Sequence, residues 1–253
     1  MLSVASLSHP GAVRANNEDY VLWDPAIGLL AIADGMGGHN AGEVASRLAI
    51  ETLRAYLRET ADARHIAWVF GFDPVVSLTA NRLVTGFKLA NRDVFQMAAE
   101  RSECQGMGTT LSAAIIEGAR LTFSSVGDSR LYERREGTLR LLTRDDSLLE
   151  KLAETADLAL SEAEQHPMRH LLTSVIGARP EVDATVDEIV LADQQQLLLC
   201  TDGLHGAIPE DTMRSVLEGA SDLERAIETL VHTALERDGK DNITALLARY
   251  TAD

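Results

Sequence analysis

Short apolar runs near the N-terminus of this chain are bounded by turn residues. Runs of this length, broken by glycine, proline, asparagine and aspartate, are typical of β-strands. They predict strands at residues 3–8, 20–23 and 28–33.

Two longer stretches follow in which apolar residues recur at helical spacing. Between residues 41 and 58 the positions of Val44, Leu48 and Leu53 belong to one apolar stripe, which predicts an amphipathic helix. A second helix is expected over residues 75–101. The intervening residues 60–74 are expected to form a loop.

Strands recur in the middle of the chain, separated by tight turns such as Glu117-Gly118 and Glu136-Gly137. This spacing predicts an antiparallel meander. The expected strands are residues 110–116, 120–126, 130–134 and 139–143. The charged stretch 147–166 is expected to be helical.

The C-terminal part returns to strands and then to helices. Strands are expected at residues 184–190, 196–201 and 243–250. Pro209 is suited to open a helix. Ser221 and Glu224 have the spacing of a capping box for a further helix that ends near Glu236.

The order of these elements indicates the fold class. Helix pairs interrupt groups of antiparallel strands rather than alternating with single strands, which argues against a doubly wound parallel sheet. We therefore expect an α+β fold with two packed antiparallel sheets and helices outside them. No break in composition divides the chain, so residues 1–253 are expected to form a single domain.

Composition and charge narrow the function. The formal net charge is −16, and phosphate backbones require a basic face, so we expect no nucleic acid partner. An acidic, solubilising surface explains most of this excess. No apolar run reaches the roughly 18 residues of a membrane span, so we expect a cytoplasmic protein with no membrane partner.

The two cysteines argue against one kind of phosphatase. A cysteine-based enzyme would need a phosphate-binding loop with an arginine six positions after the cysteine. Thr110 follows Cys104 at that spacing, and Gly206 follows Cys200. Cys200 lies in an apolar run and is expected to be a buried thiol.

Four aspartates follow predicted strands and suggest a metal site. Asp34, Asp128, Asp202 and Asp241 occur in the segments IADGMGG, SVGDSR, LCTDGLHG and KDNIT. A buried carboxylate needs a partner, and a hard divalent cation is a common partner for several of them. The alternative is that these residues are ordinary turn or cap aspartates.

Taken in order, these segments resemble the metal-dependent serine/threonine protein phosphatases of type 2C, and the bacterial branch in particular. The resemblance also includes GAVRANNEDY and GMGTTLSAAII, and it runs from about residue 8 to residue 249. It implies an αββα sandwich, with two packed antiparallel sheets flanked by helix pairs. It also implies two Mn²⁺ or Mg²⁺ ions in a cleft at one end, and a flap at about residues 145–180.

The resemblance assigns roles by position. Asp34 resembles the carboxylate that bridges both metals, and Gly35 the residue whose carbonyl binds one of them. Asp202 and Asp241 resemble ligands of the other metal, and Asp128 a ligand of a weakly bound third ion. Glu18 and Asp19 resemble carboxylates that hold metal-bound waters, and Arg14 the arginine that receives the substrate phosphate.

These residue types suit the implied reaction, which is hydrolysis of phosphoserine and phosphothreonine. Two cations would offset the charge of the phosphate and lower the pKa of a bridging water or hydroxide. A guanidinium binds two phosphate oxygens in a way that lysine cannot match. Expected partners are phosphorylated proteins, among them a serine/threonine kinase or its targets, and the protein is expected to be a monomer.

Two departures from the family pattern leave alternatives open. Asp146 stands where the family commonly has histidine, and Ser174 where bacterial relatives usually have arginine. A weakly active or non-catalytic phosphoprotein-binding regulator is therefore one alternative. A metal phosphohydrolase acting on small phosphoesters is another.

Overall fold

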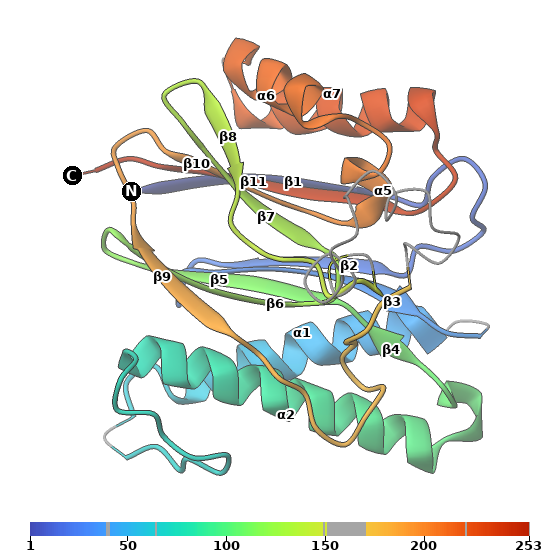
Figure 1. Cartoon of the computed structure of the whole chain (residues 1–253), viewed down its shortest axis with the longest axis vertical. Helices are drawn as coiled ribbons and strands as arrows, with labels where there is room; N and C mark the ends of the chain where they lie inside the picture. The colour runs from blue at the N-terminus through green and yellow to red at the C-terminus, as the bar shows by residue number, and fades with distance from the viewer. Residues whose placement is uncertain (39–40, 64, 149, 151–170, 221, 253) are drawn as a thin grey trace.

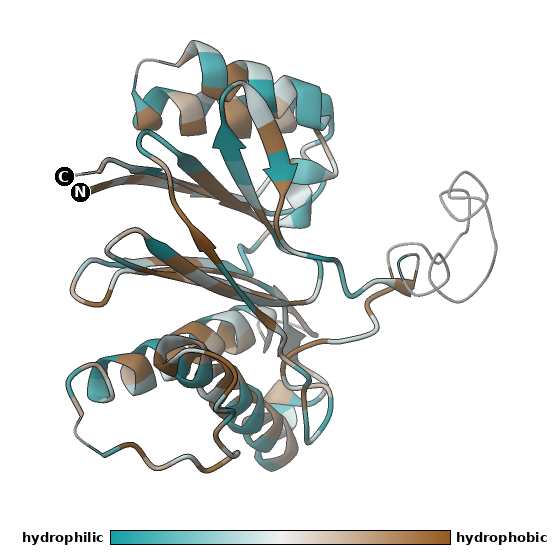
Figure 2. Ribbon diagram, turned by 60° about the vertical axis from the view of Figure 1, so that its left-hand side comes forward, coloured by the Kyte–Doolittle hydropathy of each residue, from teal (hydrophilic) through white to brown (hydrophobic). Residues whose placement is uncertain are grey.

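Four stacked layers make up the molecule (Figure 1). The computed structural model describes residues 1–38, 41–63, 65–148, 150, 171–220 and 222–252. Two antiparallel sheets form the inner layers, and pairs of helices cover their outer faces (Figures 1 and 2). The predicted α+β class and the αββα sandwich are both confirmed.

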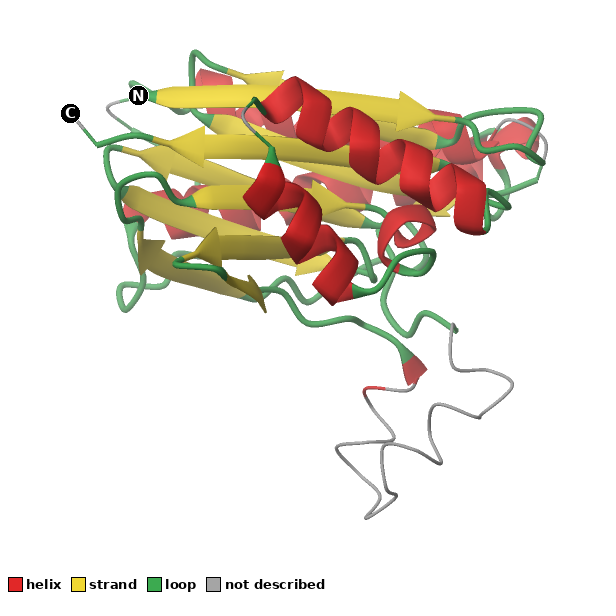
Figure 3. Ribbon diagram, turned by 90° about the horizontal axis from the view of Figure 1, so that it is seen from above, coloured by secondary structure: helices red, strands yellow, loops and turns green. Residues whose placement is uncertain are grey.

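The first sheet has the strand order β1-β11-β10-β7-β8. Its strands are β1 (Leu2–His9), β7 (Arg130–Arg135), β8 (Thr138–Leu141), β10 (Gln196–Cys200) and β11 (Ile243–Tyr250). Helices α6 (Glu210–Gly219) and α7 (Leu223–Arg237) lie over this sheet (Figure 3).

The second sheet has the order β2-β3-β5-β6-β9, and a short strand, β4, pairs with the end of β3. Its strands are β2 (Asp19–Asp24), β3 (Leu29–Met36), β4 (Gly108–Thr109), β5 (Leu111–Glu117), β6 (Arg120–Val126) and β9 (Val186–Val190). Helices α1 (Ala41–Glu59) and α2 (Leu78–Glu100) cover its outer face, and a 3₁₀ turn (Ser102–Cys104) follows α2.

Strand β3 shows why its sequence is continuously apolar. Successive side chains of a strand point to opposite faces, and both faces of β3 are buried. Leu30 and Ile32 pack in the core between the two sheets, whereas Leu29, Ala31 and Ala33 pack against the helices of the second sheet. A third core lies between the first sheet and the helices α6 and α7.

Several element boundaries differ from the predictions. Helix α2 begins at Leu78 rather than at residue 75, because the Ser77 side chain accepts a hydrogen bond from the backbone N–H of Ala80 and caps the helix there. Asp222 caps α7 in the same way through Arg225 N, whereas the predicted cap Ser221 lies outside the described residues. Most of the helix expected at 147–166 also lies outside them.

The aspartates after strands are positioned differently from simple turns. Asp34 lies within β3, which continues to Met36 because Gly35 and Met36 pair with β4. Asp202 is the first residue of a short helix, α5 (Asp202–His205). Neither β4 nor α5 was predicted, because both are too short to show a periodic pattern.

Strand direction brings the candidate residues to one end of the sandwich. The ends of β1, β3, β6 and β10 and the starts of β2, β5, β7 and β11 all lie at this end. Thr201, after β10, donates a hydrogen bond of 2.9 Å from its hydroxyl to Oδ2 of Asp19 in β2. This bond joins the two sheets directly beneath the candidate site.

Candidate functional site

An acidic cavity of about 250 Å³ opens at this end of the sandwich. It brings together all but one of the site residues predicted from the sequence. The residues that line it are Arg14, Glu18, Asp34, Gly35, Met36, Gly37, Thr110, Asp128, Leu172, Asp202, Asp241 and Asn242. Asp19 is the exception, because it is buried beneath the cavity floor.

The backbone of Asp34 is fixed by two threonines. Its N–H donates to Oγ1 of Thr110 at 2.9 Å, and its carbonyl accepts from Thr110 N and from the Thr109 hydroxyl, each at 2.8 Å. The carboxylate is therefore held in the cavity wall. Burial, and then the nearby charge of Asp19, raise the pKa of Asp34 well above its ordinary value.

Two Asp-Gly pairs use glycine for close packing of backbone. A Cβ on Gly35 would collide with the carbonyl oxygens of Gly42 and Glu18, and a Cβ on Gly203 would collide with that of Asn242. Gly35 N also donates to Glu18 O at 3.1 Å. These contacts set the first turn of α1 and the loop before β2 against the carboxylates of the cavity.

Glu18 on the cavity wall and Asp19 beneath the cavity floor add two further carboxyl groups to the site. Burial raises the pKa of Glu18, and burial raises that of Asp19 to about 7. Among the residues that the structure describes, Glu18 Oε1 and Asp19 Oδ1 are buried oxygens that accept no hydrogen bond. Such oxygens are costly to leave without a partner, so a cation or its waters would satisfy them.

Asp128 lies in a turn after β6. Burial, and then the charge of Asp202, raise the pKa of its carboxyl to about 7. The preceding Gly127 has a φ of +100°, and a Cβ there would collide with Thr110. Asp146 holds this turn, because its Oδ2 accepts from Gly127 N at 3.1 Å and its own N donates to Gly127 O at 2.8 Å.

Arg14 is the one cationic side chain that lines the cavity among the described residues. Its Nη2 lies 2.9 Å from Oδ2 of Asp241, and this hydrogen bond raises the pKa of Arg14. Both side chains are about half exposed, at 53% and 42%. The ion pair is therefore accessible to solvent from the cavity.

Asn242 is a site residue to which the sequence reasoning gave no role. Its Oδ1 accepts from Glu18 N at 2.8 Å, and its Nδ2 donates to the carbonyls of Pro10 and Asn16, each at 2.9 Å. It thereby fixes the loop that carries Arg14 to the start of β11. Asn242 stands in the segment KDNIT, which the sequence analysis singled out for Asp241. Its role could not be predicted there because its three hydrogen-bond partners are distant in sequence.

The flap region is only partly within the described residues. Leu172 lines the cavity, and Thr173 donates its N–H to Asp146 O at 2.7 Å. Ser174, the second departure from the family pattern, is half-buried in the same segment. The segment that returns from the flap is thus attached to the turn that carries Asp128.

The charge balance of the cavity favours cations. Among the residues that the structure describes, five carboxylates line it beside one guanidinium. Within the described ranges, no three His, Cys, Asp or Glu side chains already converge as a closed set of ligands for one ion. Carboxylates on the wall of an open cavity suit hard cations that retain several waters, rather than a dehydrated cage.

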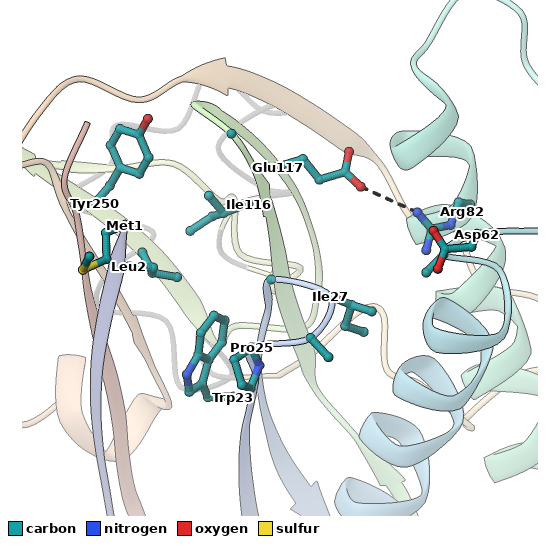
Figure 4. Close-up of a pocket in the computed structure, with 14 residues that line it drawn as sticks. Met1, Leu2, Trp23, Pro25, Ile27, Asp62, Arg82, Ile116, Glu117 and Tyr250 are labelled. Atoms are coloured by element: carbon teal, nitrogen blue, oxygen red, sulfur yellow. Dashed lines mark ion pairs between the residues drawn. The ribbon is translucent and has the colours of Figure 1, made fainter. Parts of the chain in front are cut away.

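A larger cavity, of about 600 Å³, lies at the opposite end of the sandwich (Figure 4). Its walls carry Trp23 and Tyr250, and its charged residues in the described chain are Asp62, Arg82 and Glu117. Arg82 lies 3.7 Å from Glu117 and donates to Thr60 and to Leu57 O, so it supports the junction of α1, α2 and β5. Among the described residues, only the carboxylates of Asp62 and Glu117 line this end, against five in the acidic cavity.

Two sheets packed between helix pairs, with a cavity lined by acidic residues and Arg14 at one end, fit the class of metal-dependent phosphatases. The chain belongs to the protein phosphatase 2C family, whose model matches residues 12–248. Members of this family are hydrolases.

Curated relatives and solved structures agree with this assignment. The chain is 33% identical over 223 residues to a serine/threonine phosphatase, stp, of Listeria welshimeri, which covers 87% of this chain and 83% of the relative. It is 35% identical over 249 residues to the phosphatase PstP of Mycobacterium tuberculosis, covering 98% of this chain and 45% of that longer protein.

The structural similarity extends over nearly the whole chain. The crystal structure of M. tuberculosis PstP superposes with a TM-score of 0.85 at 33% identity, covering 99% of both chains. The PstP catalytic domain in complex with two manganese ions gives a TM-score of 0.82 at 32% identity, covering 99% of this chain and 98% of that one.

Proposed function

We propose that this protein is a metal-dependent phosphatase that hydrolyses phosphoserine and phosphothreonine in proteins. The observation that carries this proposal is the acidic cavity, in which Asp34, Asp128, Asp202 and Asp241 face the same space as Arg14. The relatives named serine/threonine phosphatases and the manganese complex of PstP support it.

The residues present fit two divalent cations. Asp34, the carbonyl of Gly35, Asp202 and Asp241 would hold two Mn²⁺ or Mg²⁺ ions, and Asp128 a third, weaker one. Glu18 and Asp19 would hold metal-bound waters through their buried oxygens. When bound, the ions would supply an activated water and offset the negative charge of the phosphate.

The protein's own groups then bind and orient the substrate. Arg14 leaves its ion pair with Asp241 and binds two oxygens of the phosphate, a geometry suited to a guanidinium. Its release leaves Asp241 Oδ2 free to bind a cation. Asn242 keeps the Arg14 loop in register with β11, so the phosphate is received at a fixed place above the carboxylates.

The setting of this activity is also proposed. Substrates are phosphorylated proteins, among them a serine/threonine kinase or its targets, within cytoplasmic signalling. The protein acts as a monomer, and residues 1–253 form one catalytic domain with a flap at about 145–180. No helix in the described part of the chain combines the length and apolarity of a membrane span.

Neither alternative activity is favoured. A non-catalytic regulator would be expected to lose site carboxylates, whereas all of those predicted line the cavity or lie directly beneath it. Asp146 has a structural contact beside the site, because its carboxylate accepts a hydrogen bond from Gly127 N. The small-phosphoester alternative is separated from ours by comparing a phosphopeptide with nucleotide substrates.

The test is phosphate release from a phosphothreonine peptide. Purified protein should release phosphate with MnCl₂ and stop when a chelator is added. Asp34→Asn should lower kcat by at least about 100-fold, since charge stabilisation of this kind is worth several kcal/mol. Asp211→Asn, at an exposed position on α6, is the matched control and should keep full activity. Full activity of Asp34→Asn would refute the proposed role of Asp34.

A further inference from the structure

The turn at residues 127–129 is held through the backbone of every residue in it. Asp146 binds both the N–H and the carbonyl of Gly127. The carbonyl of Ser129 accepts from the hydroxyl of Ser112 at 2.6 Å and from that of Ser125 at 3.1 Å. The carbonyl of the middle residue, Asp128, is bound by a side chain of another element.

His205 provides that third attachment. Its Nε2 lies 3.0 Å from the backbone carbonyl oxygen of Asp128. A carbonyl oxygen can only accept, so Nε2 must carry the proton and donate it in this bond. The ring is half-buried between α5 and the turn.

The same short helix carries a site carboxylate. Asp202 and His205 lie at the first and last positions of α5, three residues apart, so they lie on one side of a single helical turn. One helix thus presents Asp202 to the cavity and attaches the backbone of Asp128 to itself. This fixes the separation of two acidic side chains that are 74 residues apart in sequence.

The hydrogen bond from His205 to the Asp128 turn opposes the repulsion between two carboxylates. Asp128 and Asp202 line one cavity, so their carboxylates repel each other when no cation lies between them. A free turn would relax by moving Asp128 away. Each cation bound would then have to restore the geometry, at a cost in affinity.

We infer that His205 is a positioning residue that holds the Asp128 turn against α5, so that Asp128 and Asp202 are kept ready to bind a cation together. The inference rests on the proposed function. His205 touches neither substrate nor the reacting atoms in this account, and it acts through the backbone of Asp128.

The test is calorimetric titration of metal-free protein with MnCl₂. His205→Ala removes the donor. His205→Gln replaces it with a side-chain N–H of similar reach, and His205→Asn places an N–H too close to its own backbone. His232→Ala, at an exposed position on α7, is the matched control. Circular dichroism of each metal-free variant checks that it is folded.

We expect His205→Ala and His205→Asn to weaken the lowest-affinity manganese binding by about tenfold or more, the range found for residues that orient metal ligands. His205→Gln should stay within about threefold of the wild type, and His232→Ala should match it. The manganese concentration for half-maximal activity should follow the same order, with KM for the phosphopeptide unchanged.

Three outcomes would overturn the inference. His205→Ala could bind manganese as the wild type does, or His205→Gln could lose as much affinity as His205→Ala. If His205→Ala does not fold, equal affinities of the Gln and Asn variants would overturn it. A wild type that binds no manganese would instead contradict the proposed function, so the two failures are distinguishable.

Discussion

Arg14 and Asp241 form an ion pair at 2.9 Å although 227 positions separate them in the chain. The pair lies on the wall of the acidic cavity and joins the proposed phosphate-binding residue to a proposed metal ligand. While the two side chains are paired, Arg14 is not free to bind an anion and Asp241 Oδ2 is not free to bind a cation. Cation and phosphate binding should consequently favour each other.

Removing the guanidinium should separate these two effects. We expect Arg14→Ala to lower kcat/KM for a phosphothreonine peptide by about 10- to 100-fold, because charge-assisted hydrogen bonds to the phosphate are lost. Manganese affinity without phosphate should be unchanged or higher, since Asp241 loses its competing partner. Steady-state kinetics and calorimetry measure the two quantities. Arg92→Ala, which removes an exposed guanidinium paired with Asp93 on α2, is the control.

Asn242 should matter for stability as well as activity. Asn242→Ala removes three part-buried hydrogen bonds, each worth about 1 kcal/mol, so we expect a loss of about 2–3 kcal/mol in the free energy of unfolding. Urea unfolding of the metal-free protein measures this loss. Unchanged stability together with unchanged activity would show that the Arg14 loop is held by other contacts.

We expect Asp24, the last residue of β2, to contribute to the stability of the fold in a way that is lost in acid. Its side chain is 0% exposed and accepts hydrogen bonds from Arg58 and Arg54, which lower its pKa to about 2. The folded-state pKa lies below the unfolded value, so the stabilisation is fully present above about pH 4 and is lost as pH falls towards 2.

The measurement is the difference in unfolding free energy between the wild type and Asp24→Asn. We expect a difference of about 2 kcal/mol at pH 7 that decreases steadily between about pH 4 and pH 2. The control Asp211→Asn should change the free energy of unfolding little at any pH in this range. A difference for Asp24→Asn that does not change with pH would contradict the assignment.

The carboxyl groups of the cavity should change stability with pH in the direction opposite to Asp24. Asp19 and Asp128 have folded-state pKa values of about 7, above their unfolded values, so the folded protein binds more protons between about pH 4 and pH 7. Metal-free protein should therefore lose stability as pH rises through this window.

Thermal unfolding tests this claim with and without metal. In the presence of chelator, Tm should be lower at pH 8 than at pH 6, and MnCl₂ should raise Tm more at pH 8, because cations bind deprotonated carboxylates. A chelated protein whose Tm rises between pH 6 and pH 8 would contradict the electrostatic account of the cavity.

Sequence patterns predicted the long elements well because burial imposes a period on them. The continuous apolar run of β3 and the stripe of α1 reflect faces that the fold buries. The start of α2 was placed three residues too early because the apolar Val75 and Val76 precede the cap at Ser77. Capping depends on one side-chain hydrogen bond and not on periodicity.

The candidate site was predicted because its carboxylates occur in ordered local motifs. Asp34, Asp128, Asp202 and Asp241 line one cavity, although their catalytic roles remain predictions. Pairings across long sequence separations could not be predicted. The contact of His205 with Asp128, the pairing of Arg14 with Asp241, and the three bonds of Asn242 arise only when β6, α5 and β11 meet in space.

Anomalous diffraction at the manganese absorption edge, from crystals grown with MnCl₂, tests the central claim most directly. The account predicts two strong manganese peaks inside the cavity bounded by Asp34, Asp202 and Asp241, with Arg14 released from Asp241. Crystals that hold manganese elsewhere while this cavity remains empty would contradict it.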